Sequence, residues 1–331
     1  MGTVSNRLDT LLASGVRGLI GPTASGKSAL ALRVAEAAGA ELVSLDSMLV
    51  YRGMDVGTAK PTRAERERVR HHLLDLVLPH EDFDVARFQA ELVRALEDAE
   101  RRGARVLFVG GTGFYLKVLL ERMFEGPAVD RELRSRIEAR CATEGNAALH
   151  TELARVDAPS AARIHANDTK RLVRALEVFE QTGRALSAWQ TEWSSFGAAT
   201  AGRPRTLVGL ELPVPELDRR IAERTRAMLD AGWADEALAI ESAGGFSKTA
   251  IQALGYREVL ELAHGRATRP ETESRIALAT RQFARRQRTW YRKFPETTWF
   301  AAAEAGRCGA RRTLVFEPSS APWIGTRLRA P

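Results

Sequence analysis

The chain has 331 residues, of which 44% are hydrophobic and 27% charged, and its formal net charge is +7. This composition excludes global disorder and, because Cys141 and Cys308 are the only cysteines, a disulfide framework; no run approaches the roughly eighteen apolar residues of a membrane span. We therefore expect a cytoplasmic protein of one or two domains without a membrane partner. The basic charge permits a nucleic-acid partner, although a general preference for arginine would produce the same excess.

The first segment that carries chemistry runs from Gly21 to Ser28, Gly-Pro-Thr-Ala-Ser-Gly-Lys-Ser, and matches the phosphate-binding loop pattern. It lies between a short predicted strand at 18–20 and a predicted helix at 29–38 that Gly39 ends. Such a loop points backbone N–H groups and a helix N-terminus at an anion, and Lys27 adds a full positive charge. We predict a diphosphate or triphosphate site with Ser28 as a Mg²⁺ ligand. Its expected residues are Gly21, Thr23, Ala24, Ser25, Gly26, Lys27 and Ser28.

Strands and helices alternate in the segment that follows. Apolar runs predict strands at 41–47, 73–77 and 105–109, and helices at 62–72, 84–102 and 114–121. This alternation predicts an α/β fold, a P-loop core with a mostly parallel sheet flanked by helices. Asp46 lies at the carboxyl end of one of these strands and Thr112 follows another, and open α/β sheets bind ligands at the carboxyl ends of their strands.

The pattern changes after Gly126 and Pro127, where helices follow one another to about residue 190. We expect one of them to start at Asp130 and another after Asn167 and Asp168. A predicted strand at 206–210 returns to the sheet, followed by arginine-rich helices at 215–231 and 275–293 and a last strand at 297–300. We therefore predict the first part of the core at 14–126, an inserted all-helical domain at 127–203, a return to the core at 204–300 and a weakly structured tail at 301–331.

Several segments in chain order closely resemble the tRNA dimethylallyltransferase family. They are the loop at 21–28, the run from Asp46 to Pro61, and residues 109–115, 164–168, 171–177, 255–257 and 285–290. Leu49 stands where many members carry glutamine, and leucine cannot make the polar contact near the target base that glutamine could. Phe114 stands where leucine is common. The eukaryotic zinc finger is absent from a chain with two cysteines, so the resemblance is to the bacterial type.

The resemblance implies transfer of a dimethylallyl group from dimethylallyl diphosphate to the exocyclic amine of the adenosine beside the anticodon of tRNA, with release of diphosphate and Mg²⁺ as cofactor. It assigns Asp46 as the general base, although position alone fits equally an acid that orients Mg²⁺ or a helix cap. It makes Thr112 a contact to the reacting amine, where a helix N-cap is the alternative. It makes Arg224 a ligand of the diphosphate, where an exposed charge on a helix is the alternative. Thr23 either donates its hydroxyl hydrogen to the diphosphate or only forms the turn.

Contacts to the tRNA anticodon stem-loop are expected from basic helices and from the resemblance. The segment from Arg281 to Lys293 contains no acid, whereas a merely solvated helix face usually mixes charges of both signs. Aromatic residues there fit stacking on bases, although core packing is their commoner use. The predicted tRNA contacts are Ser47, Met48, Leu49, Arg134, Lys170, Arg171, Arg174, Gly255, Tyr256, Arg257, Arg285, Arg286, Gln287 and Trp290.

Three other functions fit the phosphate-binding loop. A small-molecule kinase would use ATP as phosphoryl donor, an adenylate isopentenyltransferase would prenylate a free nucleotide, and a nucleotide-switched module would bind RNA without transfer. The run from Asp46 to Pro61 argues against the kinase. We expect a monomer.

Overall fold

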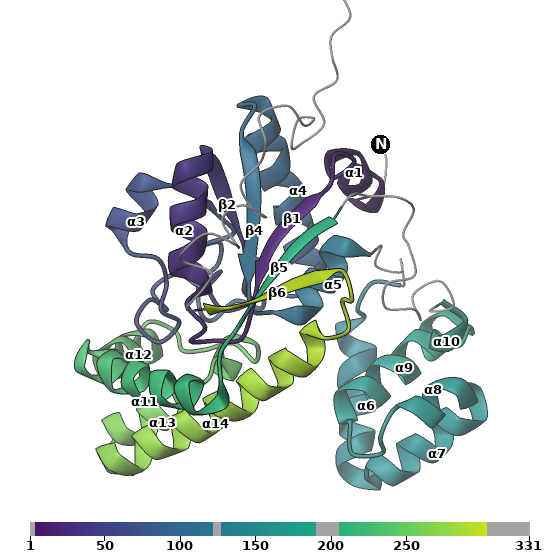
Figure 1. Ribbon diagram of the computed structural model, residues 1–331. Helices are drawn as coiled ribbons and strands as arrows, with labels where there is room; N and C mark the ends of the chain where they lie inside the picture. The colour runs from purple at the N-terminus through teal and green to yellow at the C-terminus, as the bar shows by residue number, and fades with distance from the viewer. Residues whose placement is uncertain (1–3, 122–126, 190–204, 303–331) are drawn as a thin grey trace, which may run out of the picture. The chain divides into compact units, whose positions relative to one another are not determined.

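A six-stranded sheet, parallel throughout, organises the computed structural model, which describes residues 4–121, 127–189 and 205–302 (Figure 1). The strand order is β3-β2-β4-β1-β5-β6. The strands are β1 (Val16–Ile20), β2 (Ala40–Leu45), β3 (His71–His72), β4 (Arg105–Gly110), β5 (Arg205–Glu211) and β6 (Thr297–Ala301). The predicted α/β fold with a parallel sheet is confirmed.

Helices connect and cover these strands. In the first part of the chain they are α1 (Val4–Leu11), α2 (Lys27–Ala38), α3 (Arg63–Arg68), α4 (Val85–Arg101) and α5 (Gly113–Leu120). Next come α6 (Arg131–Glu144), α7 (Asn146–Val156), α8 (Ala158–Arg163), α9 (Thr169–Thr182) and α10 (Leu186–Trp189). After β5 follow α11 (Val214–Asp230), α12 (Trp233–Ser242), a 3₁₀ turn at Ala250–Gln252, α13 (Tyr256–Ala263) and α14 (Arg269–Tyr291).

The chain divides into two compact units, one formed by residues 1–120 and 199–331 and the other by residues 121–198. The larger contains the sheet, and the described part of the smaller is helical. No described helix is long and apolar enough to cross a membrane. The tail predicted at 301–331 lies, from residue 303 onward, outside the described residues.

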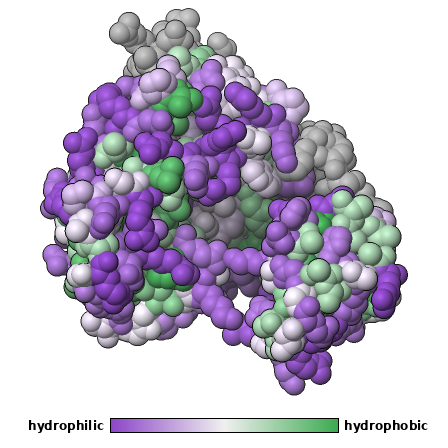
Figure 2. All heavy atoms as spheres, turned by 90° about the horizontal axis from the view of Figure 1, so that it is seen from below, coloured by the Kyte–Doolittle hydropathy of each residue, from purple (hydrophilic) through white to green (hydrophobic). Residues whose placement is uncertain are grey.

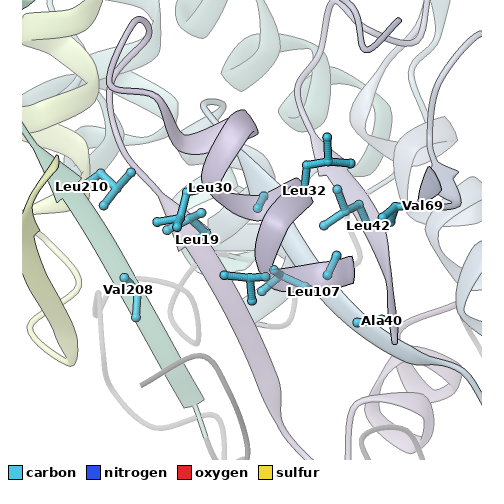
Figure 3. Close-up of a cluster of buried hydrophobic side chains, with 12 residues drawn as sticks. Leu19, Leu30, Leu32, Ala40, Leu42, Val69, Leu107, Val208 and Leu210 are labelled. Atoms are coloured by element: carbon cyan, nitrogen blue, oxygen red, sulfur yellow. The ribbon is translucent and has the colours of Figure 1, made fainter. Parts of the chain in front are cut away.

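A buried apolar cluster fixes α2 on the sheet (Figure 3). Leu30 and Leu32 of α2 pack against strand residues that include Leu19, Leu42 and Leu107. Because these side chains come from β1, β2 and β4, the cluster holds the start of α2 at the carboxyl ends of those strands. Burial of each large side chain contributes about 1.5–3 kcal/mol.

Local signals in the sequence set several helix ends. The carboxylates of Asp130 and Asp168 accept backbone hydrogen bonds at the starts of α6 and α9, as predicted. Gly39 ends α2 in the left-handed conformation, with φ 58°. These interactions depend on neighbours in the sequence, which is why the sequence reveals them.

The segment after α3 differs from the prediction. The predicted helix at 62–72 ends at Arg68, because Val69 is extended and buried, and the predicted strand at 73–77 is wrong. Leu73 and Asp75 adopt left-handed backbone conformations, with φ 62° and 53°, which lie outside the β region of a regular strand. The Asp75 carboxylate accepts hydrogen bonds from Lys60 and Arg66, which lie 15 and 9 residues before it in the chain, too far to belong to one strand pattern. These tertiary contacts account for the irregular path.

The smaller unit contains a buried carboxylate, Glu177 of α9, with 0% exposure. Arg134 donates to it through Nε and Nη2, at 3.1 and 2.5 Å, and the Nη1 of Arg174 lies 3.1 Å from it. Two arginines that were predicted to contact tRNA are thus paired within their own unit. Only the exposed part of each guanidinium remains accessible to a ligand.

Replacing Glu177 with glutamine is expected to lower the free energy of unfolding of this unit by about 2 kcal/mol. The amide keeps only one acceptor oxygen and carries no charge, so the guanidinium groups of Arg134 and Arg174 lose their counter-ion and one of the two acceptor oxygens becomes a donor. Urea unfolding followed by circular dichroism measures the change, with Glu138→Gln on the exposed face of α6 as the matched control. Equal stability of the two variants would contradict this account.

Candidate active site

Three loops meet at the carboxyl edge of the sheet because β4 lies between β1 and β2. Ile20 and Leu45 both pair with Gly110, so the three strands end in register and the loops that follow them begin side by side. They are the phosphate-binding loop after β1, Asp46 after β2, and the turn from Gly111 to Gly113 after β4. The sheet thereby brings Asp46 and Thr112 to the phosphate-binding loop, where the sequence placed them.

The phosphate-binding loop has the backbone that its pattern requires. Ala24 and Gly26 have φ of 61° and 87°, and a Cβ on Gly21 would lie 2.9 Å from the carbonyl oxygen of Leu210. Glycine avoids the steric cost at two of these three positions, while Ala24 bears it. Lys27 is the first residue of α2, so the helix N-terminus faces the loop.

Two cations and one carboxylate form the electrostatic centre of this site. Burial lowers the pKa of Lys27 to about 8; the negative charge of Asp46 opposes this shift, and the positive charge of Arg224 adds to it. Burial likewise lowers the pKa of Arg224, again opposed by Asp46. Nη1 of Arg224 donates to the Thr23 hydroxyl at 3.4 Å, which brings α11 to the loop. Such a cluster can bind an anion, because the ligand would supply the negative charge that Asp46 only partly provides.

Asp46 and Thr112 have hydrogen bonds that define their orientation. Oδ1 of Asp46 accepts from the backbone N–H of Met48 at 2.9 Å, whereas Oδ2 has no hydrogen bond among the described residues. The Thr112 hydroxyl accepts from the N–H of Ser47 at 3.1 Å and donates to the Ser47 hydroxyl at 3.4 Å. One Asp46 oxygen therefore stabilises the turn, and the other is available to accept a proton. Thr112 joins the loops after β2 and β4.

A carboxylate that the sequence analysis did not identify holds the run that starts at Asp46. Glu236 of α12 accepts hydrogen bonds from three consecutive N–H groups, those of Asp55, Val56 and Gly57, at 2.7–3.1 Å. It also accepts from the Tyr256 hydroxyl at 2.6 Å. No local pattern marks Glu236, because the three backbone N–H groups lie about 180 residues before it in the chain and Tyr256 lies 20 residues after it.

Lys60 anchors the same run from the other side. Its side chain is 1% exposed and lies 2.7 and 2.6 Å from the carboxylates of Asp55 and Asp75. It also donates to the carbonyl oxygen of Tyr51 at 2.5 Å. The run after Asp46 is therefore held by ion pairs to one buried ammonium group, in a segment that carries Ser47, Met48 and Leu49, all partly exposed.

The predicted tRNA-contacting residues divide by burial. Lys170, Arg171, Arg257, Arg285 and Arg286 are exposed, and Trp290 is partly exposed. Tyr256 is 0% exposed, Gly255 is buried beneath Trp233, and Gln287 is 5% exposed. Hydrophilic residues predominate on the surface seen from the side of α11 and α14 (Figure 2). The exposed side chains are accessible to a ligand, whereas the three buried residues are not.

The site fits a Mg²⁺ that arrives with a diphosphate. The described residues contain no group of three or more His, Cys, Asp or Glu side chains that could hold a metal by themselves. Ser28 is exposed in the first turn of α2, beside the loop. Mg²⁺ prefers few protein ligands together with phosphate oxygens and water, so one hydroxyl at this position suits it. Ser28 would hold the ion.

The parallel sheet, the phosphate-binding loop and the acid beside it define a P-loop α/β enzyme that binds a phosphorylated substrate. A family model described as IPP transferase matches residues 49–294. The chain therefore belongs to the IPP transferase family. The resemblance to tRNA dimethylallyltransferases found in the sequence is confirmed.

Relatives and solved structures agree with this assignment. A tRNA dimethylallyltransferase of Methylococcus capsulatus is 46% identical over 290 residues, which cover 87% of this chain and 92% of the relative. One of Geobacter metallireducens is 46% identical over 84% of this chain and 90% of its own length. The crystal structure of the tRNA isopentenylpyrophosphate transferase of Bacillus halodurans is 33% identical, with a TM-score of 0.62, and covers 87% of this chain and 90% of that one. A eukaryotic dimethylallyltransferase acting on tRNA has a TM-score of 0.74 at 25% identity and covers 90% and 77% of the two chains.

Proposed function

We propose that this protein transfers a dimethylallyl group from dimethylallyl diphosphate to the exocyclic amine of the adenosine beside the anticodon of tRNA. The observation that carries the proposal is the meeting of Asp46 with Lys27 and Arg224 at a phosphate-binding loop, in a member of the IPP transferase family. We further propose that it acts as a monomer in the cytoplasm, where its tRNA substrate is found.

In this reaction the adenine nitrogen forms a bond to the first carbon of the dimethylallyl group, and the bond from that carbon to the diphosphate oxygen breaks. The electron pair leaves with the diphosphate, so negative charge grows next to Lys27, Arg224 and the loop N–H groups. A Mg²⁺ held by Ser28, when bound, supplies further positive charge there. The attacking amine loses a proton, which the second oxygen of Asp46 accepts.

The substrate test uses labelled dimethylallyl diphosphate with total tRNA, with AMP or with no acceptor. Label transferred to tRNA supports the proposal, while label transferred to AMP but not to tRNA would replace it with a nucleotide prenyltransferase. Turnover of ATP without prenyl transfer would favour the kinase or the nucleotide switch.

Exchanging Arg285 and Arg286 for alanine is expected to weaken tRNA binding and to reduce the salt dependence of that binding. Each phosphate contact that is lost lowers the slope of log K against log salt by about 1. Filter binding of tRNA at several salt concentrations gives the slope. The matched control is the double change Arg33→Ala and Arg94→Ala, which removes the same charge from exposed positions on α2 and α4. A slope equal to that of the wild type would show that this part of α14 is only a solvated surface.

A further inference from the structure

A glutamine within the arginine-rich helix α14 connects two loops of the site. The side-chain oxygen of Gln287 accepts a hydrogen bond from the backbone N–H of Thr23 at 2.8 Å. Its amide nitrogen donates to the carbonyl oxygen of Gly111 at 2.7 Å. Thr23 belongs to the phosphate-binding loop after β1, and Gly111 to the turn after β4. One buried side chain therefore ties together loops from neighbouring strands.

The peptide group between Pro22 and Thr23 extends this connection to Lys27. Its N–H points to Gln287, and its carbonyl oxygen accepts a hydrogen bond from Nζ of Lys27 at 3.3 Å. A trans peptide is planar, with N–H and C=O on opposite sides, so an orientation imposed on one end is imposed on the other. The position of the Lys27 ammonium is thus coupled to the hydrogen bond that Gln287 makes, together with the one that the same carbonyl oxygen accepts from the backbone N–H of Ser25 at 3.3 Å.

Close packing leaves the amide little freedom. A Cβ added to Gly111 would lie 2.6 Å from Nε2 of Gln287 and 3.7 Å from Nζ of Lys27. On the next turn of α14, a Cβ on Gly113 would lie 2.9 Å from the ring of Trp290. One side of α14 is therefore fitted to the backbone of the turn after β4, while Arg285 and Arg286 of the same helix are exposed.

We propose that Gln287 is a positioning residue for diphosphate binding: it orients the Pro22–Thr23 peptide and, through it, Lys27, and it holds the phosphate-binding loop against the turn that carries Thr112. This rests on the proposed function for the identity of the diphosphate substrate. In this assignment Gln287 acts through the two backbone groups that its amide binds and not by contact with a substrate, and its side chain is buried.

The test compares Gln287→Met, which has similar volume and no amide, with the wild type and with Gln282→Met, an exposed glutamine on the same helix. The expected result is about a tenfold weaker binding of dimethylallyl diphosphate by calorimetry and a matching rise in KM. The dissociation constant for tRNA should stay within about twofold, and Gln282→Met should match the wild type. Unchanged diphosphate affinity in a folded Gln287→Met protein would overturn the inference.

A second variant, Gln287→Glu, separates the hydrogen bonds from simple packing. Its ionised carboxylate can accept from Thr23 but cannot donate to Gly111, whereas the protonated form can do both. At pH 8 an ordinary glutamate is ionised, so Gln287→Glu should bind dimethylallyl diphosphate more weakly than the wild type, although the two side chains are nearly equal in size. An affinity equal to that of the wild type would show that the hydrogen bond to Gly111 is not needed and would overturn the inference. If the wild type itself binds no dimethylallyl diphosphate, the proposed function fails instead.

Discussion

Replacement of Asp46 by asparagine is expected to reduce kcat for dimethylallyl transfer by about 10²–10⁴-fold. Asparagine retains an oxygen that can accept from the N–H of Met48, so the turn after β2 is preserved. It cannot take up a proton from the attacking amine. The measurement is single-turnover transfer at saturating dimethylallyl diphosphate and tRNA. Saturation is needed because the negative charge of Asp46 acts on Lys27, so its loss also changes diphosphate binding.

The affinity for tRNA separates this role from a binding role. It should remain within about twofold of the wild type in Asp46→Asn, as it should in Asp46→Ala, where transfer is abolished. Glu100→Gln, at the exposed end of α4, removes the same charge far from the carboxyl edge of the sheet and should leave both quantities unchanged. A parallel loss of tRNA affinity and of transfer would show that Asp46 is not the base.

The second large effect concerns the pH dependence of diphosphate binding. The pKa of Lys27 in the free protein is about 8, lowered mainly by burial. As pH rises through that value the ammonium loses its proton and its attraction for the diphosphate, so kcat/KM for dimethylallyl diphosphate should fall above about pH 8. kcat/KM reports groups of the free enzyme, which makes it the quantity to measure.

Lys27→Met should lower kcat/KM by about 10²-fold or more and remove this fall above pH 8. Lys248→Met, an exposed lysine outside the site, is the matched control and should keep the wild-type profile. A wild-type profile that stays level to pH 10 would contradict the assignment of Lys27 as the diphosphate cation.

Folding stability should respond to the same group in the opposite direction. The pKa of Lys27 is lower in the folded chain than its ordinary value of 10.5, so the unfolded chain binds more protons between pH 8 and 10.5. The cost of burying the ammonium is therefore present below pH 8 and is relieved as pH rises through that window. Compared with Lys27→Met, the wild type should gain stability over this range, while its affinity for diphosphate falls.

The smaller unit shows how far local patterns extend. Asp130 and Asp168 predict where α6 and α9 begin, because a capping carboxylate bonds to backbone groups two or three residues away. Nothing local predicts that Arg134 pairs with Glu177, 43 residues further along the chain. Arg134 is a predicted tRNA contact only by the family resemblance, and by residue type alone it is a surface charge, whereas Arg174 lies in a basic helical stretch. Only the packed helices reveal that the two arginines share a partner.

The sequence by itself determined the parts of this protein that depend on short-range chemistry: the phosphate-binding loop, the alternation that produces a parallel sheet, and the acid and the threonine at its carboxyl edge. Tertiary structure decided what holds them in place. Glu236, Lys60 and Gln287 act on groups far away in the chain, and buried polar groups need such partners whatever their separation in sequence. A local pattern cannot encode a hydrogen bond between α14 and the loop after β1, because only the folded sheet brings the two together.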